Sequence, residues 1–163
     1  MSNIVLIGMP GAGKSTIGVL LAKAKGYKFC DTDILIQDRT GELLYETINR
    51  DGIDAFLSLE EEVLSNVEGD RIIFATGGSA VYGEKAMAHL KSIGTVVYIK
   101  LSYEEIVSRV NNITTRGIAM KHGKTLLDVY NERVPLYEKY ADITVECDGT
   151  TVEECVSKMI NIK

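Results

Sequence analysis

The clearest chemical signature lies near the start of the chain, in the segment Gly8-Met9-Pro10-Gly11-Ala12-Gly13-Lys14-Ser15. It follows the pattern GxxxxGK[ST], in which glycines let the backbone turn its N–H groups inward around a phosphate. In such a loop Lys14 reaches the β- and γ-phosphates of a nucleoside triphosphate, and Ser15 offers its hydroxyl to Mg²⁺. The predicted helix that follows adds the positive end of its dipole. We therefore expect ATP to bind at Gly11, Ala12, Gly13, Lys14, Ser15 and Thr16.

Two carboxylates and two glycines stand at the ends of later apolar runs. Asp31 and Asp33 end a short predicted strand, and Gly77 and Gly78 follow another. Because ligands of parallel sheets bind at the carboxyl ends of the strands, all four face the phosphate loop. One carboxylate is placed to hold a metal-bound water, and the other to accept hydrogen bonds from substrate hydroxyls. The glycines let a ligand approach the backbone closely.

Three arginines in the later part of the chain offer planar forks that match phosphate or carboxylate oxygens. Arg116 lies in the least regular stretch, residues 111–124, which is a candidate mobile lid. Arg109 precedes this stretch, and Arg133 lies on a predicted helix after it. An arginine on a lid can stabilise the charge that develops during phosphoryl transfer.

The hydrophobic pattern alternates between strand and helix along the whole chain. Short apolar runs predict five strands, at 3–7, 27–30, 71–75, 95–101 and 142–147. Helical spacing predicts helices at 14–25, within 41–67 with a break near residue 51, at 84–91, from 102, at 126–140 and from 151. This alternation is typical of a parallel sheet with helices on both faces. We predict one α/β domain over residues 1–163, a three-layer sandwich around a parallel five-stranded sheet.

Local sequence signals predict where two helices begin and where a third bends or ends. Ser102 with Glu105, and Thr151 with Glu154, match the capping box, in which the two side chains satisfy each other's backbone N–H groups. Pro135 falls inside the helix predicted at 126–140 and lacks an N–H group, so we expect a kink or a boundary there.

The bulk composition bounds the possible partners. With 163 residues the chain can bury a proper core, and its net charge of -5 argues against nucleic acid, whose binding depends on Lys and Arg. No apolar run approaches the roughly 20 residues that cross a bilayer, so we expect no membrane partner. The three cysteines show no CxxC spacing, which favours free thiols packed as small hydrophobes in a cytoplasmic protein.

These motifs together resemble the shikimate kinases, members of the nucleoside monophosphate kinase group of P-loop proteins. The resemblance spans nearly the whole chain. It rests on Gly8 to Thr16, Asp31-Thr32-Asp33, Thr76-Gly77-Gly78, the seven-residue separation of Arg109 and Arg116, and Arg133-Val134-Pro135-Leu136-Tyr137-Glu138 with Ala141-Asp142. It implies ATP-dependent phosphorylation of shikimate to shikimate 3-phosphate in aromatic amino acid biosynthesis, with Mg²⁺ as cofactor. It also implies substrate-binding helices at about 34–62, a lid at about 110–124, and a monomer.

The resemblance assigns a role to each matched residue. Lys14 and Ser15 bind phosphate and Mg²⁺, and Asp31 supports the metal through water. Asp33 binds substrate hydroxyls and is the candidate base. Among the arginines, Arg109 packs on adenine, Arg116 closes with the lid onto the phosphates, and Arg133 pairs with the substrate carboxylate. The catalytic set implied is Lys14, Asp33 and Arg116, and the substrate-binding set is Asp33, Gly77, Gly78 and Arg133.

The chain departs from the family pattern in its substrate half. The family's Phe-Arg-x-x-Glu reads Phe56-Leu57-Ser58-Leu59-Glu60, so leucine stands where an arginine clamps the carboxylate of shikimate. Ser79 replaces the third glycine of Gly-Gly-Gly, and Arg116-Gly117-Ile118 replaces Arg-Pro-Leu. Leucine offers no donor to a buried carboxylate.

Three hypotheses for the function follow from these departures. The first is a shikimate kinase in which Arg133 alone, or a nearby arginine such as Arg50, holds the carboxylate. The second is a kinase of the same fold that acts on another small polyol or hydroxy acid. The third is a nucleotide-binding module with impaired catalysis, against which stands the retention of the phosphate-binding and substrate-binding residues together. A GTPase is disfavoured because the guanine-reading Asn-Lys-x-Asp is absent from the sequence.

Overall fold

A parallel sheet forms the centre of the computed structural model, which describes residues 2–110 and 118–163. Its five strands are β1 (Asn3–Ile7), β2 (Lys28–Asp31), β3 (Ile72–Ala75), β4 (Gly94–Lys100) and β5 (Ile143–Glu146). They stand in the order β2-β3-β1-β4-β5, and each neighbouring pair is parallel. The parallel five-stranded sheet predicted from the alternating pattern is confirmed.

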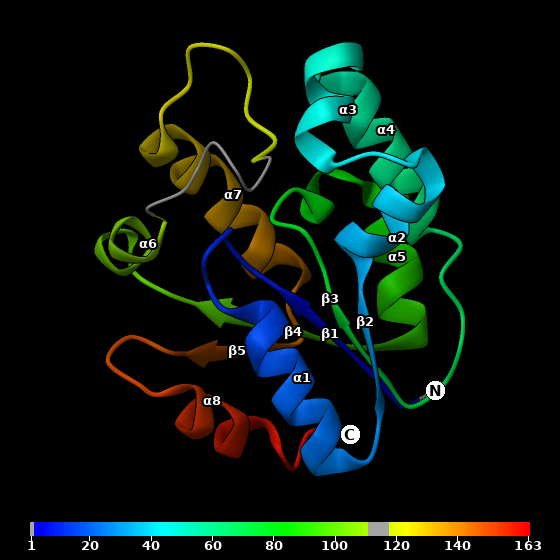
Figure 1. The fold of residues 1–163 in the computed structure, drawn as a ribbon. Coiled ribbons are helices and arrows are strands. Elements are labelled where there is room, and N and C mark those ends of the chain that lie inside the picture. Colours follow the sequence, from blue (N-terminus) through cyan, green and yellow to red (C-terminus); the bar gives the residue numbers. More distant parts are fainter. Residues whose placement is uncertain (1, 111–117) are drawn as a thin grey trace.

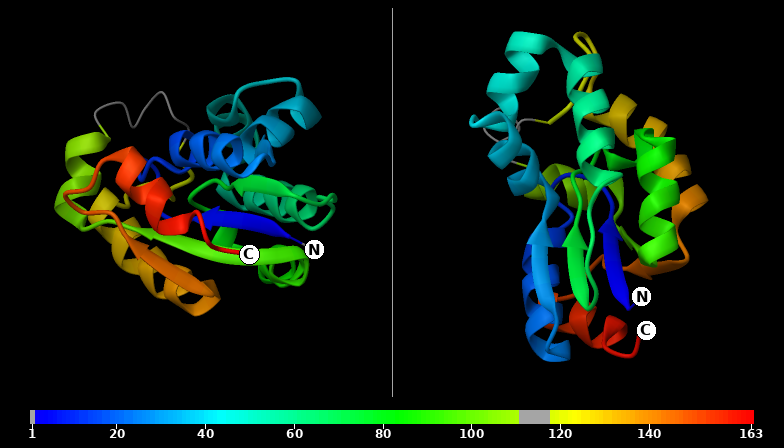
Figure 2. Two further views of the ribbon diagram at one scale, coloured as in Figure 1. Left: turned by 90° about the horizontal axis from the view of Figure 1, so that it is seen from below. Right: turned by 90° about the vertical axis from the view of Figure 1, so that its right-hand side faces the viewer.

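Helices cover both faces of this sheet (Figure 1). They are α1 (Lys14–Lys25), α2 (Thr32–Thr40), α3 (Leu44–Asp51), α4 (Ile53–Leu64), α5 (Glu84–Ile93), α6 (Tyr103–Arg109), α7 (Leu126–Tyr140) and α8 (Val152–Met159), with a short 3₁₀ helix η1 (Ala80–Tyr82). In the left view of Figure 2, α1 and α8 lie on one side of the sheet and α5 and α7 on the other, so the three-layer sandwich is confirmed. Over residues 2–110 and 118–163, no helix is both long and apolar enough to cross a membrane.

The central strand β1 shows why the sequence folds in this way. All five of its residues are buried, as expected for a strand with neighbours on both edges and helices on both faces. Its one polar residue, Asn3, satisfies its amide through Gly69 and Ile93 and accepts a hydrogen bond from the Ile72 amide. Each apolar side chain buried here contributes about 1.5–3 kcal/mol relative to exposure.

The carboxyl ends of the strands lie along one edge of the sheet. At this edge β1 continues into the phosphate loop and β2 continues directly into α2. The helices α2 to α4 rise above it on one side, and the segment 118–124, yellow in Figure 1, rises on the other. The phosphate loop, these helices and this segment therefore lie around the carboxyl ends of the strands.

The region of the predicted substrate-binding helices differs in detail from the sequence expectation. Three helices, α2 to α4, occupy Thr32 to Leu64, and α2 was not separated in the strand and helix pattern. The predicted break near residue 51 is confirmed, because Gly52 ends α3 and begins α4 at a φ of 86°. Of the lid predicted at about 110–124, residues 111–117 lie outside the described part, and residues 118–124 contain no helix or strand.

Two local predictions about helix ends are corrected. The boundary allowed at Pro135 is wrong, since α7 runs from Leu126 to Tyr140 with Pro135 inside it, held by the buried side chains of Arg133 and Tyr137 on either side. The second half of the capping box at Ser102 is also wrong. Its hydroxyl accepts from the Glu105 amide, but its own N–H donates to Asp148, while the predicted box at Thr151 is complete.

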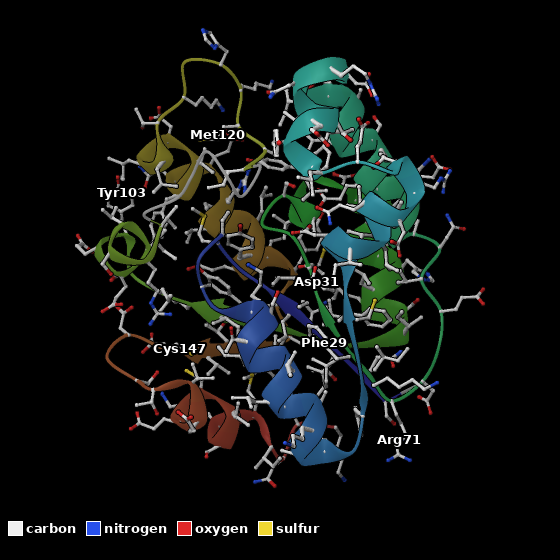
Figure 3. The ribbon with its side chains drawn as sticks, in the orientation of Figure 1. Phe29, Asp31, Arg71, Tyr103, Met120 and Cys147 are labelled. Carbon is white, nitrogen blue, oxygen red and sulfur yellow. The ribbon has the colours of Figure 1, made fainter. Side chains whose placement is uncertain are left out.

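The cysteine prediction holds in two of three cases. All three thiols are free, and Cys147, labelled in Figure 3, is buried together with Cys155. Cys30 on β2 is only half-buried, because β2 is an edge strand of the sheet and packs against fewer neighbours. Cys30 therefore packs as a partly covered surface residue rather than as a core hydrophobe.

Candidate active site

The phosphate loop connects β1 to the N-terminus of α1. Gly11 and Gly13 have φ angles of 82° and 85°, a left-handed conformation in which only glycine is free of strain. These turns place backbone N–H groups on the inner side of the loop, above the positive end of the α1 dipole. Lys14 is buried, and its Nζ donates to the carbonyl oxygens of Gly8 and Met9, 2.8 Å away in each case. The loop thus presents a fixed concave set of donors suited to an anion.

Ser15 and Asp31, the two residues predicted to serve the metal, are in contact. The Ser15 hydroxyl donates to Oδ2 of Asp31 at 2.8 Å. Asp31 lies where β2 passes into α2, beside the start of α1 (Figure 3). Its other oxygen accepts from the Asp33 amide and so caps α2. In the described part of the chain, no three His, Cys, Asp or Glu side chains form a metal cluster. One hydroxyl with one carboxylate fits Mg²⁺, which takes few protein ligands and completes its shell with phosphates and water.

Asp33 is the second residue of α2 and lies over the backbone of Gly77. A Cβ atom on Gly77 would stand 2.7 Å from Oδ1 of Asp33 and 3.0 Å from Oε2 of Glu60, so only glycine fits between the two carboxyl groups. Burial and the neighbouring charge of Asp31 raise the pKa of Asp33 to about 6, against the opposing effect of Lys14. A carboxyl group with this pKa is poised to accept a proton near neutral pH.

Glu60 was not predicted as a site residue, yet it is the most deeply buried carboxyl group at this edge. It is 2% exposed, and its Oε1 accepts a 2.6 Å hydrogen bond from the Ser79 hydroxyl. Its Oε2 has no hydrogen-bond partner among the described residues. Burial, with a smaller effect from the charge of Asp33, raises the pKa of Glu60 to about 7. Ser79, where the family pattern has a third glycine, therefore supplies a polar contact to this carboxyl group.

Arg133 approaches the same space from α7. Its side chain is 1% exposed, and one Nη donates to the Ala119 carbonyl oxygen. A Cβ atom on Gly78 would stand 2.9 Å from Nη1 of Arg133, so the absence of a side chain at Gly78 admits the guanidinium group. Over residues 2–110 and 118–163, no carboxylate forms an ion pair with Arg133. The charge of Arg133 acts on the nearby carboxyl group of Glu60, but without direct contact, so this buried cation is well placed to pair with an anionic ligand.

One cavity of about 340 Å³ brings together the phosphate loop, Asp33 and Arg133, whereas Asp31 and Glu60 do not line it. It is bounded by most of the predicted residues, namely Gly11, Gly13, Lys14, Ser15, Thr16, Asp33, Gly77, Gly78, Arg109 and Arg133. The predicted Ala12 belongs to the loop but is buried beneath it. Arg109 ends α6 and pairs with Glu105 at 3.4 Å. Arg116 lies outside the described residues.

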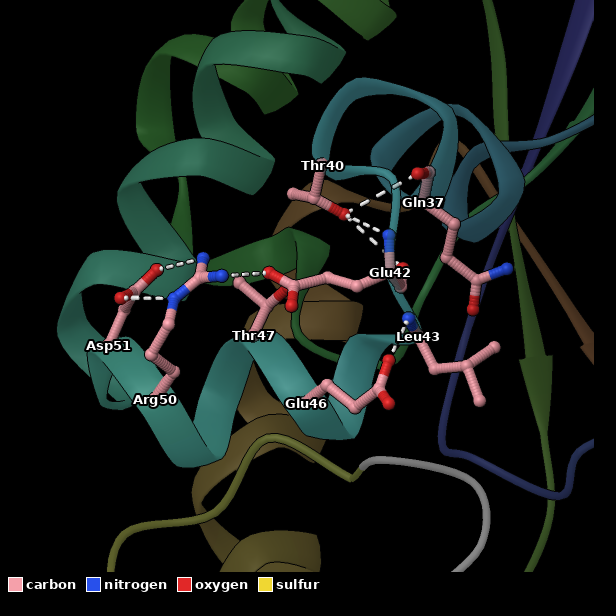
Figure 4. Close-up of polar contacts among 8 residues, drawn as sticks. All are labelled: Gln37, Thr40, Glu42, Leu43, Glu46, Thr47, Arg50 and Asp51. Carbon is pink, nitrogen blue, oxygen red and sulfur yellow. Dashed lines mark hydrogen bonds and ion pairs between the residues drawn. The ribbon is translucent and has the colours of Figure 1, made fainter.

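Two side chains considered for the substrate carboxylate lie elsewhere. Arg50 lies in the last turn of α3, where it pairs with Asp51 and Glu42 at 2.7 and 2.6 Å (Figure 4). It does not border the cavity, so the proposal that Arg50 replaces the missing arginine receives no support from its position. Leu57 borders a second, neighbouring cavity together with Tyr82, and Ala119 forms part of both walls.

The residues that sequence reasoning missed had one recognisable signal. On α4, Phe56, Glu60 and Leu64 are spaced four apart and all are buried, so a charged residue interrupts the apolar face of the helix. Such an interruption indicates a buried carboxyl group with a specific partner. Nothing comparable marks Tyr82 or Ala119, whose neighbours come from distant parts of the chain.

This fold and site define the nucleoside monophosphate kinase-like class of P-loop proteins. The family model described as "Shikimate kinase" matches residues 10–163. The shikimate kinase of Francisella tularensis subsp. holarctica (strain FTNF002-00 / FTA) is 37% identical over 161 residues, covering 96% of this chain and 92% of that protein. The shikimate kinase of Thermodesulfovibrio yellowstonii is 34% identical over 163 residues, covering 98% and 94%.

Solved structures agree with the sequence relatives. The structure of shikimate kinase from Acinetobacter baumannii in complex with shikimate matches with a TM-score of 0.88 at 29% identity, covering 98% of this chain and 91% of that one. The chain belongs to the shikimate kinase family.

Proposed function

We propose that this protein transfers the γ-phosphoryl group of ATP to a hydroxyl group of shikimate, yielding shikimate 3-phosphate. The observation that carries the proposal is the position of Arg133, a buried cation without a carboxylate partner in the described part of the chain, across one cavity from the phosphate loop. A carboxylate paired with Arg133 would hold a small hydroxylated acid between this arginine and the nucleotide phosphates. Family membership supports shikimate as that acid.

The donor half of the reaction belongs to the phosphate loop. In the proposal, the backbone amides from Gly11 to Ser15 and the ammonium group of Lys14 bind the β- and γ-phosphates and neutralise the charge that develops there. Arg109 at the end of α6 lies at the rim of the cavity, where it would pack against the base of ATP. We assign to Arg116 the neutralisation of the transferred group, as the resemblance implies.

The Ser15 and Asp31 pair would hold Mg²⁺, Ser15 directly and Asp31 through a water molecule. When bound, the ion would offset the negative charge of the phosphates during transfer. The 2.8 Å contact between the two side chains supports this assignment, because it shows that both oxygens reach one point. The capping bond from Asp33 to Asp31 fixes the carboxylate there.

The acceptor half rests on Asp33, which would bind the attacking hydroxyl group and accept its proton. Its raised pKa supports this role, because a general base works best when its pKa lies near the pH at which the enzyme operates. The absence of side chains at Gly77 and Gly78 lets the carboxyl group of Asp33 and the guanidinium group of Arg133 lie against the backbone, where both would contact the substrate. As the resemblance implies, we also propose that the protein works as a monomer, and the need for ATP favours the cytoplasm.

The test is a coupled assay of ADP release with shikimate and with a panel of hydroxylated acids and polyols. We expect release that depends on shikimate, with the phosphorylated product identified by ³¹P NMR. Lys14→Ala should abolish it, while Lys23→Ala, which removes an exposed lysine from the same helix, should leave it intact. Release that depends on another panel member but not on shikimate would overturn the substrate assignment, and full turnover by Lys14→Ala would overturn the site.

A further inference from the structure

Arg133 is held in place by a side chain that lies outside the family motifs. Tyr82, the last residue of η1, accepts a hydrogen bond from Nε of Arg133 at 3.3 Å. The guanidinium carbon also lies 5.3 Å from the centre of the Tyr82 ring, within the range of a cation–π contact. Two different contacts from one tyrosine therefore restrain the only described arginine that is buried in the cavity wall.

The direction of the hydrogen bond is fixed by a third residue. Tyr82 has one hydroxyl proton, and it donates this proton to Oε1 of Glu132 at 2.5 Å. Its oxygen lone pairs are then free to accept from the Nε–H group of Arg133. Glu132 is held in turn by Lys124, which donates to its other carboxylate oxygen. Hydrogen bonds from Lys124 and Tyr82 lower the pKa of Glu132, so it remains an acceptor at neutral pH.

These contacts leave a defined part of the guanidinium group for a ligand. Nε is used by Tyr82 and one Nη by the Ala119 carbonyl oxygen, while Nη1 borders the position above Gly78. A carboxylate in the cavity would therefore meet a guanidinium group whose orientation is already set. Such preorganisation matters most in this chain, since Leu57 cannot supply a second cation.

We propose that Tyr82, with its orientation fixed by Glu132 and Lys124, is a positioning residue that holds Arg133 ready for the carboxylate of the substrate. The proposal rests on the function proposed above, because it takes Arg133 as the carboxylate-binding residue. Tyr82 does not touch the reacting atoms in this arrangement. It acts on the binding of the acceptor through Arg133, and on neither ATP nor phosphoryl transfer.

Tyr82→Phe tests the proposal, since it keeps the ring and removes only the hydroxyl group. We expect the KM for shikimate to rise by about tenfold or more, the effect of one hydrogen bond to a charged group, with kcat and the KM for ATP changed by less than about twofold. Tyr103→Phe is the matched control, because Tyr103 packs edge-on against Tyr130 and borders none of the cavity. It should leave all three constants unchanged.

A substrate analogue in which CH₂OH replaces the carboxylate separates positioning from general damage. For this analogue, kcat/KM should be the same in the wild type and in Tyr82→Phe, because no carboxylate meets Arg133. An equal loss with both acceptors would overturn the proposal in favour of a merely structural role. An unchanged KM for shikimate would overturn it as well.

A readout without substrate keeps this proposal distinct from the proposed function. The ¹⁵N NMR signal of Arg133 Nε–H, assigned by its loss in Arg133→Lys, should exchange with solvent about tenfold faster or more in Tyr82→Phe than in the wild type or Tyr103→Phe. A wild type inactive on shikimate would refute the function and leave this signal readable. Unchanged exchange in Tyr82→Phe would refute the positioning role whatever the activity.

Discussion

The buried carboxyl group of Glu60 makes the stability of this protein depend on pH in a predictable way. Glu60 lies on the apolar face of α4, is 2% exposed, and keeps one oxygen without a partner among the described residues. Glu60→Gln preserves the shape of the side chain and the acceptor for the Ser79 hydroxyl, and it removes the possibility of a charge. The substitution therefore isolates the cost of ionising this group inside the protein.

The expected magnitude follows from the pKa of Glu60, about 7 in the folded protein against the ordinary value of 4.5. A raised carboxyl pKa means that the folded state keeps its proton where the unfolded state has lost it, so the free energy of unfolding falls as pH rises. The fall begins near the ordinary value and is complete above about pH 7. Over this window the wild type should lose about 3 kcal/mol relative to Glu60→Gln.

Urea denaturation of both proteins between pH 4.5 and 8 measures this difference. The stability gap between Glu60→Gln and the wild type should widen in favour of the variant by about 3 kcal/mol across that range. Glu61→Gln is the matched control, since it removes a neighbouring carboxylate that accepts from the Lys85 amide at the surface, and it should show no widening in favour of the variant as pH rises. A gap for Glu60→Gln that stays constant, or narrows as pH rises, would refute the reasoning.

Two further predictions concern the acceptor site. Leu57→Arg should lower the KM for shikimate, because it adds a cation to the second cavity, which meets the first at Ala119. Leu57→Met, which adds no charge, should not, and equal effects of the two would contradict a role for charge. Asp33→Asn should lower kcat by about 10²-fold to 10⁴-fold in steady-state assays while the KM for ATP stays within about twofold, and equal loss of both would remove Asp33 from the acceptor site.

The local motifs were predictable from the sequence because consecutive residues form them. The phosphate loop is complete within Gly8 to Ser15, and its glycines adopt the positive φ angles that the motif requires. The capping box at Thr151 likewise depends on residues three apart. The alternation of strand and helix predicted the parallel sheet, although the order of its strands is set by packing that no local pattern records.

The acceptor site was predictable only in part, since its geometry depends on residues that are distant in the chain. Glu60 meets Ser79 19 residues later, and Arg133 meets Tyr82 across a separation of 51. Arg50 was a reasonable candidate by sequence, but the turn of α3 directs it to Asp51 and Glu42 instead. Leucine at position 57 is visible in the sequence, whereas the second cavity that it borders is not.

The sequence by itself therefore determined the class of chemistry. It supplied a phosphate-binding loop, carboxylates at the ends of strands, and an arginine that can bind an acidic substrate. These features follow from residue type and short spacing, which fix local backbone geometry. The tertiary structure alone decided how the buried guanidinium group of Arg133 is oriented and which carboxyl groups lie together in the low-dielectric interior. Burial and long-range contacts set both, because the pKa of Glu60 and the restraint on Arg133 depend on neighbours brought together only by folding.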